Sequence, residues 1–295
     1  KMPDSEPLTF DWNGTNTDGA PLPDGVYNYK IAATDRAGNK SAPAGINNLI
    51  YSAEKPATNI VINGSRYFSP VGNGAKSVLF DVKIPLPDAR SGNKLSNWAV
   101  TIIGTDGKEY KKYEGTDNPP STIEFDGTDD SGKTLADGSY QAVVTAKYLN
   151  GYEPDVVRSP VFMLDTSKPV ATLKTNGSVF SPDGDGNQDA MEITQTVMTN
   201  NGAPVSNWVG TVTDAHGALV RTFNFGSYPP EKFSWDGLDG NSQLAADGEY
   251  TYNLSATDAA GNEASYSTSK FALDTSKAEI MLTTSALAFN PAGDR

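Results

Sequence analysis

The feature that most limits how this chain can fold is a repeat of about 110 residues. A short pattern occurs three times: an aromatic residue before Asn-Gly or Asp-Gly, followed by Asp-Gly-x-Tyr. Its tyrosines, Tyr27, Tyr140 and Tyr250, are almost evenly spaced along the chain. A second marker begins at Phe68, Phe180 and Phe289 and is spaced in nearly the same way. Two interleaved markers with matching periods indicate a true internal repeat.

A unit of this length matches a whole β-sandwich and is far longer than a solenoid repeat. The joints between units are the segments Leu164–Pro169 and Leu273–Ala278. We therefore expect the C-terminal part of a module at 1–53, complete modules at 54–166 and 167–276, and the opening strand of a further module at 277–295. The first three of these ranges are called the first, second and third repeat copies below.

The strands of each copy show the apolar alternation of a sheet with one buried face. After Asp-Gly-x-Tyr, the segments Tyr140–Ala146 and Tyr250–Ala256 are apolar at every second position, and Trp98 and Trp208 are predicted to lie on a central strand with their indoles in the core. Seven strands are predicted in the third copy, at 170–174, 190–198, 207–213, 218–224, 232–235, 248–258 and 264–273. Seven short strands separated by Gly and Asp turns predict an all-β, immunoglobulin-like antiparallel sandwich.

Composition narrows the class of protein further. The chain has no cysteine, which excludes thiol chemistry and favours a bacterial origin for an exported sandwich. Its net charge of −13 argues against nucleic acid or anionic lipid as a partner, because phosphate binding needs clustered Lys and Arg. No apolar run approaches the roughly 20 residues of a membrane helix, so we expect no membrane insertion by this segment.

These motifs resemble a known family. The sequence Trp235-Asp236-Gly237, a Gly-rich turn, Asp247-Gly248-Glu249-Tyr250, and a strand ending in Ala256-Thr257-Asp258 look like the Ig-like domain of the bacterial flagellar hook-capping protein. Similar modules recur in tandem on bacterial envelope and surface proteins. The resemblance implies an exported structural or spacer module without an active site of its own.

One loop carries a pattern typical of a cation site. Asp183, Asp185, Asn187 and Asp189 offer side-chain oxygens at alternate positions, the first three separated by glycine, which suits Ca²⁺. The loop lacks the distant bidentate Glu of an EF-hand, and a tight polar turn explains the same residues. The matching segment of the second copy, 70–74, has no carboxylate, so the fold does not depend on a cation there. Calcium is the one cofactor that the sequence suggests.

Paired carboxylates also raise the possibility of glycosidase chemistry. They lie in the hairpin next to each aromatic-Asp-Gly motif, at Asp126, Asp129 and Asp130, and at Asp236 and Asp239. Because they recur once per copy in a turn, we expect them to cap their own backbone and not to catalyse a reaction.

The lone histidine and a set of tyrosines complete the candidates. His216 is predicted to lie in a solvated turn without catalytic partners. Exposed tyrosines offer a sugar- or protein-binding patch, although such residues more often cover a sheet face; they are Tyr110, Tyr113, Tyr148 and Tyr152.

The sequence therefore predicts a non-catalytic protein: tandem modules that form a semi-rigid rod or an assembly element. The parent protein is expected to be a large exported one at the bacterial cell surface or in the periplasm. Its expected partners are other copies or modules of the same parent, or envelope proteins. Two alternatives stay open: an adhesin-type protein- or glycan-binding module, and the accessory C-terminal region of a large exported hydrolase.

Overall fold

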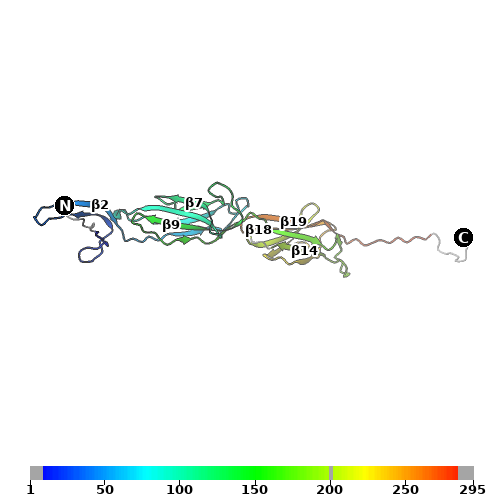
Figure 1. Cartoon of the computed structure of the whole chain (residues 1–295). Coiled ribbons are helices and arrows are strands. Elements are labelled where there is room, and N and C mark those ends of the chain that lie inside the picture. The colour runs from blue at the N-terminus through cyan, green and yellow to red at the C-terminus, as the bar shows by residue number, and fades with distance from the viewer. Residues whose placement is uncertain (1–8, 199–201, 285–295) are drawn as a thin grey trace. The chain divides into compact units, whose positions relative to one another are not determined.

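The computed structural model describes residues 9–198 and 202–284, and the regular secondary structure within them is almost entirely β-strand (Figure 1). The residues cluster into two compact units, one built mainly from the chain up to Ser167 and the other mainly from Lys168 onward. The one helical element in the described residues is a single 3₁₀ turn, η1 (Ala89–Ser91). No helix in those residues is long and apolar enough to cross a membrane.

The second repeat copy is a sandwich of two sheets. One sheet has the order β3-β5-β8, with bounds Asn59–Asn63, Val78–Lys83 and Thr122–Phe125. The other has the order β4-β11-β9-β6-β7, and β10 also pairs with β9. Its bounds are Tyr67–Phe68, Phe162–Leu164, Gly138–Tyr148, Leu95–Gly104, Glu109–Gly115 and, for β10, Val157–Arg158.

The third repeat copy has the same topology. Its smaller sheet has the order β12-β14-β17, with bounds Val170–Thr175, Met191–Met198 and Lys232–Trp235. Its larger sheet has the order β13-β20-β18-β15-β16, with β19 also paired to β18. The bounds are Val179–Phe180, Phe271–Leu273, Gly248–Asp258, Val205–Asp214, Leu219–Gly226 and, for β19, Glu263–Ser267.

Each of these copies has its own hydrophobic core, formed where the alternating apolar residues of the two sheets meet. The predicted central strands are confirmed: Trp98 on β6 and Trp208 on β15 are buried. The cores are rich in edge-to-face and tilted aromatic pairs, such as Phe80 with Phe162 at 5.3 Å and Trp235 with Tyr250 at 5.0 Å between ring centroids. Such pairs add to the free energy gained from burial alone.

The first repeat copy contributes the two-stranded sheet of β1 (Gly25–Ile31) and β2 (Ala44–Tyr51). Two hairpin glycines adopt the left-handed conformation: Gly38 between these strands has φ +90°, and Gly261 between β18 and β19 has φ +86°. An L side chain is strained at such angles, which accounts for glycine at both turns.

The structure corrects one of the predicted strands. The segment 264–273 is two strands, β19 and β20, and not one. Between them the backbone N–H of Thr268 donates to the carbonyl of Tyr252, and its Oγ1 accepts from the N–H of Tyr252 at 3.2 Å. A side-chain oxygen thus replaces the backbone acceptor of a regular ladder, and apolar alternation gives no sign of this.

One other detail differs from the sequence prediction, and the predicted opening strand at 277–295 stays a prediction. The short strands β4 and β13 were not predicted, and they pair in parallel with β11 and β20, so the sandwich is not purely antiparallel. Residues 277–284 form no strand, and 285–295 lie outside the described residues. The segment 277–284 corresponds to β3 and β12 of the two complete copies. Those strands pair with β5 and β14, and the described residues contain no strand that corresponds to β5 or β14 and could pair with 277–284.

Burial of tyrosines predicts how stability depends on alkaline pH. Desolvation raises the pKa of Tyr113 to about 12 and also raises that of Tyr252 above the usual 10.0. Because the folded-state pKa lies above the unfolded value, these groups stabilise the fold below about pH 10, and the contribution is lost as pH rises through the folded-state values. We expect the unfolding free energy, measured by denaturant titration, to fall steadily above pH 10. A Tyr252→Phe variant should show a shallower fall, and an equally steep fall would contradict the assignment.

Candidate functional site

The aspartate of each Asp-Gly-x-Tyr motif binds the residues that follow the last strand of its own copy. In the second copy, Asp137 Oδ1 accepts hydrogen bonds from the N–H and the Oγ1 of Thr166, both at 2.9 Å, and Oδ2 accepts from Ser167 Oγ at 2.8 Å. In the third copy, Asp247 Oδ1 accepts from the N–H of Thr275 at 3.1 Å and from its Oγ1 at 2.9 Å. We call this arrangement the linker clamp.

The first copy repeats the linker clamp with slightly different residues. Asp24 accepts from Ser52 Oγ and from the N–H of Ala53, both at 2.9 Å. Hydrogen bonds to an ionised carboxylate are stronger than neutral ones. The clamp therefore fixes the direction in which the chain leaves each copy.

A local turn tightens the same segment in the two complete copies. Asp165 Oδ1 accepts from the N–H of Ser167 at 3.0 Å, and Asp274 Oδ1 accepts from the N–H of Ser276 at 2.9 Å. The bond with the Ser276 side chain, followed by the backbone bond, lowers the pKa of Asp274. The lowered pKa favours the ionised carboxylate that accepts these bonds.

The linker clamp was not predicted from the sequence, although a signal was present. Asp137 lies 29 residues before Thr166, Asp24 lies 29 before Ala53, and Asp247 lies 28 before Thr275. A nearly constant separation between an aspartate and a joint indicates a contact that the repeat maintains.

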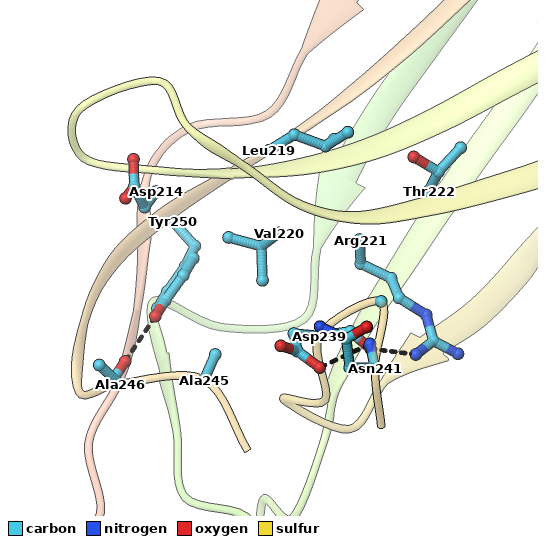
Figure 2. A pocket seen from close by; sticks show the side chains of 11 residues that line it. Asp214, Leu219, Val220, Arg221, Thr222, Asp239, Asn241, Ala245, Ala246 and Tyr250 are labelled. Atoms are coloured by element: carbon cyan, nitrogen blue, oxygen red, sulfur yellow. Dashed lines mark hydrogen bonds between the residues drawn. The ribbon is translucent and has the colours of Figure 1, made fainter. Parts of the chain in front are cut away.

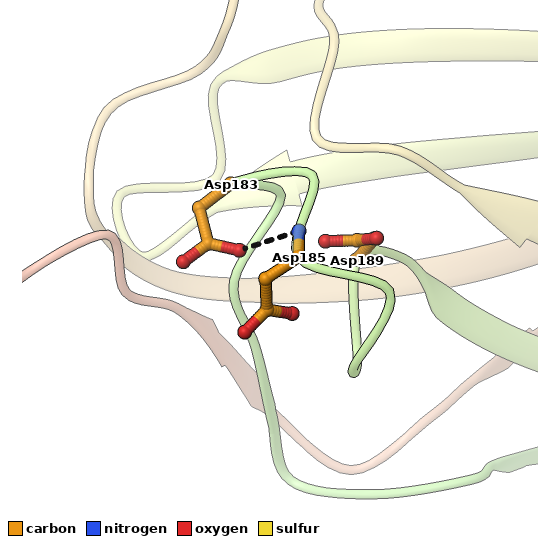
Figure 3. Close-up of side chains that lie close together, drawn as sticks. All are labelled: Asp183, Asp185 and Asp189. Carbon is orange, nitrogen blue, oxygen red and sulfur yellow. Dashed lines mark hydrogen bonds between the residues drawn. The ribbon is translucent and has the colours of Figure 1, made fainter.

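The predicted cation loop brings three of its four residues together (Figure 3). One carboxylate oxygen of each of Asp183, Asp185 and Asp189 lies within 4.8 Å of the others, and the side chains of Asp183 and Asp185 are exposed. Asn187 contributes its backbone N–H to Asp185 Oδ1 at 2.8 Å. Three converging carboxylates are a donor set that suits Ca²⁺.

The same loop also satisfies its own backbone. Asp189 accepts from the N–H groups of Gly184 and Gly186, both at 2.9 Å, and Asp183 accepts from the N–H of Asp185 at 3.2 Å. Each bond uses one lone pair of a carboxylate oxygen and leaves the others available. The geometry therefore supports the polar turn and is compatible with a cation; calcium binding stays a prediction.

Four of the five hairpin carboxylates cap their own backbone, as expected, whereas Asp130 accepts from the backbone N–H of Lys112 on β7 at 3.2 Å. Asp129 Oδ1 accepts from the N–H groups of Ser131 and Lys133, both at 2.9 Å, and Asp239 Oδ1 accepts from those of Asn241 at 2.8 Å and Gln243 at 2.9 Å. In the same way Asp126 accepts from Thr128 at 3.0 Å, and Asp236 from Leu238 at 3.1 Å. These are bonds that hold turns.

The hydrogen bonds of these turns shift the pKa values of Asp129 and Asp239. The side-chain bond from Ser131 is the main cause that lowers the pKa of Asp129, and the backbone bond from Gln243 is the main cause for Asp239. A glycosidase acid needs a raised pKa to carry a proton at neutral pH. The pKa values of the two carboxyls are shifted in the opposite direction.

A groove of about 780 Å³ in the third copy runs beside this hairpin (Figure 2). Arg221 reaches across it and donates to the backbone carbonyl of Asp239, and the Tyr250 hydroxyl donates to the carbonyl of Ala246. In the second copy Lys111 makes the matching bond to the carbonyl of Asp129 at 3.0 Å. The basic residue therefore holds the hairpin, and its recurrence at the period of the repeat could have revealed this role.

The remaining candidates do not form a site. The side chain of His216 is 92% exposed and lies 3.9 Å from Asp214, whose Oδ1 accepts backbone N–H bonds of the same turn. The four tyrosines considered as a surface patch belong to the hydrophobic core of the second copy. Tyr148 is fully buried in this core, and the partly buried Tyr110, Tyr113 and Tyr152 pack against the core.

Comparison with known proteins agrees with the motifs. Residues 186–260 match the family described as the FlgD Ig-like domain. No curated protein matches the chain.

Several solved structures are similar to the chain. A tetra-tandem repeat from the extending region of a large adhesion protein is 21% identical, with a TM-score of 0.37, and the match covers 89% of this chain and 60% of that one. A bacterial ice-binding adhesin of 1.5 MDa is 18% identical, with a TM-score of 0.39, and 76% of this chain and 67% of that one are covered. The fibronectin(III)-like modules of Clostridium thermocellum CbhA are 16% identical, with a TM-score of 0.34, and 77% and 100% are covered.

Proposed function

We propose that this chain is a spacer region of a large exported bacterial envelope or surface protein, built from Ig-like modules that act as a semi-rigid rod or as part of an assembly. The linker clamp is the observation that carries the proposal. In the second copy, the clamp and the turn at Asp165 hold three of the joint residues that separate β11 from β12, and Pro169 fixes its own φ. A joint held in this way bends less than a Gly/Ser linker of equal length.

The chemistry of the candidate groups supports a role without catalysis. The carboxylates of the Asp-Gly hairpins accept backbone N–H bonds, and the guanidinium of Arg221 holds a carbonyl. Groups engaged in holding turns serve the fold. The placement at the cell surface or in the periplasm rests on the resemblance of the modules to the FlgD Ig-like domain.

The linker clamp gives a test of this function. In the Asp137→Asn, Asp247→Asn double variant the carboxylates become amides, which weakens the charge-assisted bonds to Thr166 and Thr275. We expect small-angle scattering of the unchanged chain to show an elongated particle, and that of the variant to show a broader distribution of dimensions at the same mass. Substitution of the exposed Asp155 by Asn is the matched control. A compact particle for the unchanged chain would overturn the proposal.

We also propose that the loop Asp183–Asp189 binds calcium, because three of its carboxylates converge. A cation that binds only the folded state raises its stability by mass action. Addition of Ca²⁺ is expected to raise the melting temperature of the third copy, followed by calorimetry, and a chelator is expected to reverse the rise. Asp185→Asn should abolish the response, whereas Asp155→Asn should keep it. A transition that is the same with calcium and with chelator would remove this proposal.

A further inference from the structure

The first repeat copy exposes an apolar face that the other two copies bury. Phe10, Trp12 and Ile46 are 66%, 43% and 60% exposed, and together with Tyr29 and Ile31 they line a cavity of about 940 Å³ on the β1–β2 sheet. An aromatic surface of this kind on a soluble protein is a docking surface or a cause of aggregation.

The repeat shows what covers this face. Trp12 corresponds to Trp235, and Ile31 to Leu254, at one constant offset of two repeat periods, and both counterparts are buried. In the third copy, β18 pairs along one edge with β15 and is covered by the sheet of β12, β14 and β17. In the described residues, the matching strand β1 pairs with β2 alone.

The side chain of Tyr29 limits which strands can pack on the β1–β2 face. Its counterpart in the third copy is Tyr252, which is buried and donates its hydroxyl hydrogen bond to Gln195 Oε1 at 2.7 Å. The ring of Tyr252 also lies over Gly210: a Cβ there would come within 2.8 Å of the ring carbon Cε2, and closer still to the hydroxyl oxygen. A tyrosine at this position therefore requires a glycine in the neighbouring strand of its own sheet and a hydrogen-bond acceptor in the sheet that covers it.

In the second copy, the corresponding positions carry a small residue in place of the tyrosine and a larger residue in place of the glycine. Ala142 takes the place of the tyrosine, Val100 takes the place of the glycine, and Val82 takes the place of the glutamine. All three are buried. Next to the tyrosine, neither the glycine nor the glutamine can be replaced by valine alone, because a Cβ at the glycine position would come within 2.8 Å of the ring and valine offers the hydroxyl no acceptor.

We propose that the β1–β2 face is a docking site for a polypeptide half-sandwich of the third-copy type, with strands patterned like residues 167–231. The partner carries glycine at the position of Gly210 and an amide acceptor at the position of Gln195, both directed at Tyr29. A half-sandwich with valine at these positions is rejected, because it collides with the tyrosine ring and leaves the hydroxyl without an acceptor.

The four tryptophans of the chain make the site measurable. Trp12 is 43% exposed, whereas Trp98, Trp208 and Trp235 are 7% exposed or less. A second copy of residues 167–231, fused so that its last residue directly precedes Thr9, puts the half-sandwich in the register of the third copy. With Trp208→Phe in the added stretch only, acrylamide quenching reports on Trp12. We expect the quenchable fraction of the fluorescence to be lost in the extended chain.

Three comparisons decide the outcome. Gly210→Val in the added stretch should leave Trp12 quenchable, and so should an extension of residues 54–121, with Trp98→Phe, that carries Val82 and Val100. Tyr29→Ala should allow the 54–121 extension to protect Trp12. Equal protection by both extensions, or by neither, would overturn the proposal. The chain without an extension should give the same quenching at every protein concentration; protection that grows with concentration would assign the face to a second copy of the chain and overturn the proposal.

Discussion

Replacement of Trp235 by alanine is expected to destabilise the third repeat copy by about 3–5 kcal/mol, the usual cost of removing a large aromatic side chain from a core. The indole is almost fully buried and packs against Phe180, Tyr250 and Phe271, with ring centroids 5.0 to 6.0 Å apart. Its Nε1 also donates to the carbonyl of Leu238 at 2.9 Å. The variant would leave a cavity and a carbonyl without this donor.

The repeat provides a matched control for this experiment. Trp12 occupies the same motif position and makes the same type of bond, to the carbonyl of Thr15 at 3.0 Å, but its ring is partly in solvent. We expect Trp12→Ala to leave the calorimetric transition of the third copy unchanged and Trp235→Ala to lower it by many degrees. Similar shifts from the two variants would show that burial of Trp235 is not the source of its contribution to the stability of the third copy.

Gly210→Val is the second variant with a large expected effect. The new side chain would overlap the ring of Tyr252, and overpacking of this kind costs about 1–3 kcal/mol or more. The adjacent Thr211→Val introduces the same side chain at a partly buried position of the same strand, where the alternation directs it to the other face, and should change stability little. Equilibrium unfolding in urea would measure both.

Rescue makes the Gly210 prediction specific. The triple variant Gly210→Val, Tyr252→Ala, Gln195→Val reproduces the set found in the second copy. We expect it to recover most of the stability lost in Gly210→Val, as a large coupling energy in the mutant cycle. Losses that simply add up would mean that the three residues do not act as one packing unit, and would weaken the basis for the role of Tyr29.

The fold class was predictable because its signals are local and repeated. Alternation along Tyr250–Ala256 requires a strand, and the same pattern one repeat earlier, at Tyr140–Ala146, marks a second strand of the same kind. Turn chemistry was equally accessible: Asp129 and Asp239 bond to N–H groups two and four residues ahead, within reach of any single-sequence argument.

The candidate cation loop was predictable only in part. Alternating oxygens at Asp183, Asp185 and Asp189 follow from the sequence, but their convergence within 4.8 Å depends on how the chain folds between Phe180 and β14. The break at Thr268 and the parallel strand β13 escaped prediction for a related reason. Each depends on a partner in another strand, Tyr252 on β18 or the strand β20, which a hydrophobic pattern does not identify.

By itself, the sequence determined the β-sandwich fold and the self-capping of most of its acidic turns, because apolar alternation and Gly-Asp turn chemistry act over a few residues. Only the tertiary structure showed that Asp137 and Asp247 hold the joints, and that Tyr252, Gly210 and Gln195 form one packing unit. Those contacts join residues that are 28 to 57 positions apart, and they exist only once distant strands have paired within a sheet or, for Gln195, once the two sheets have packed.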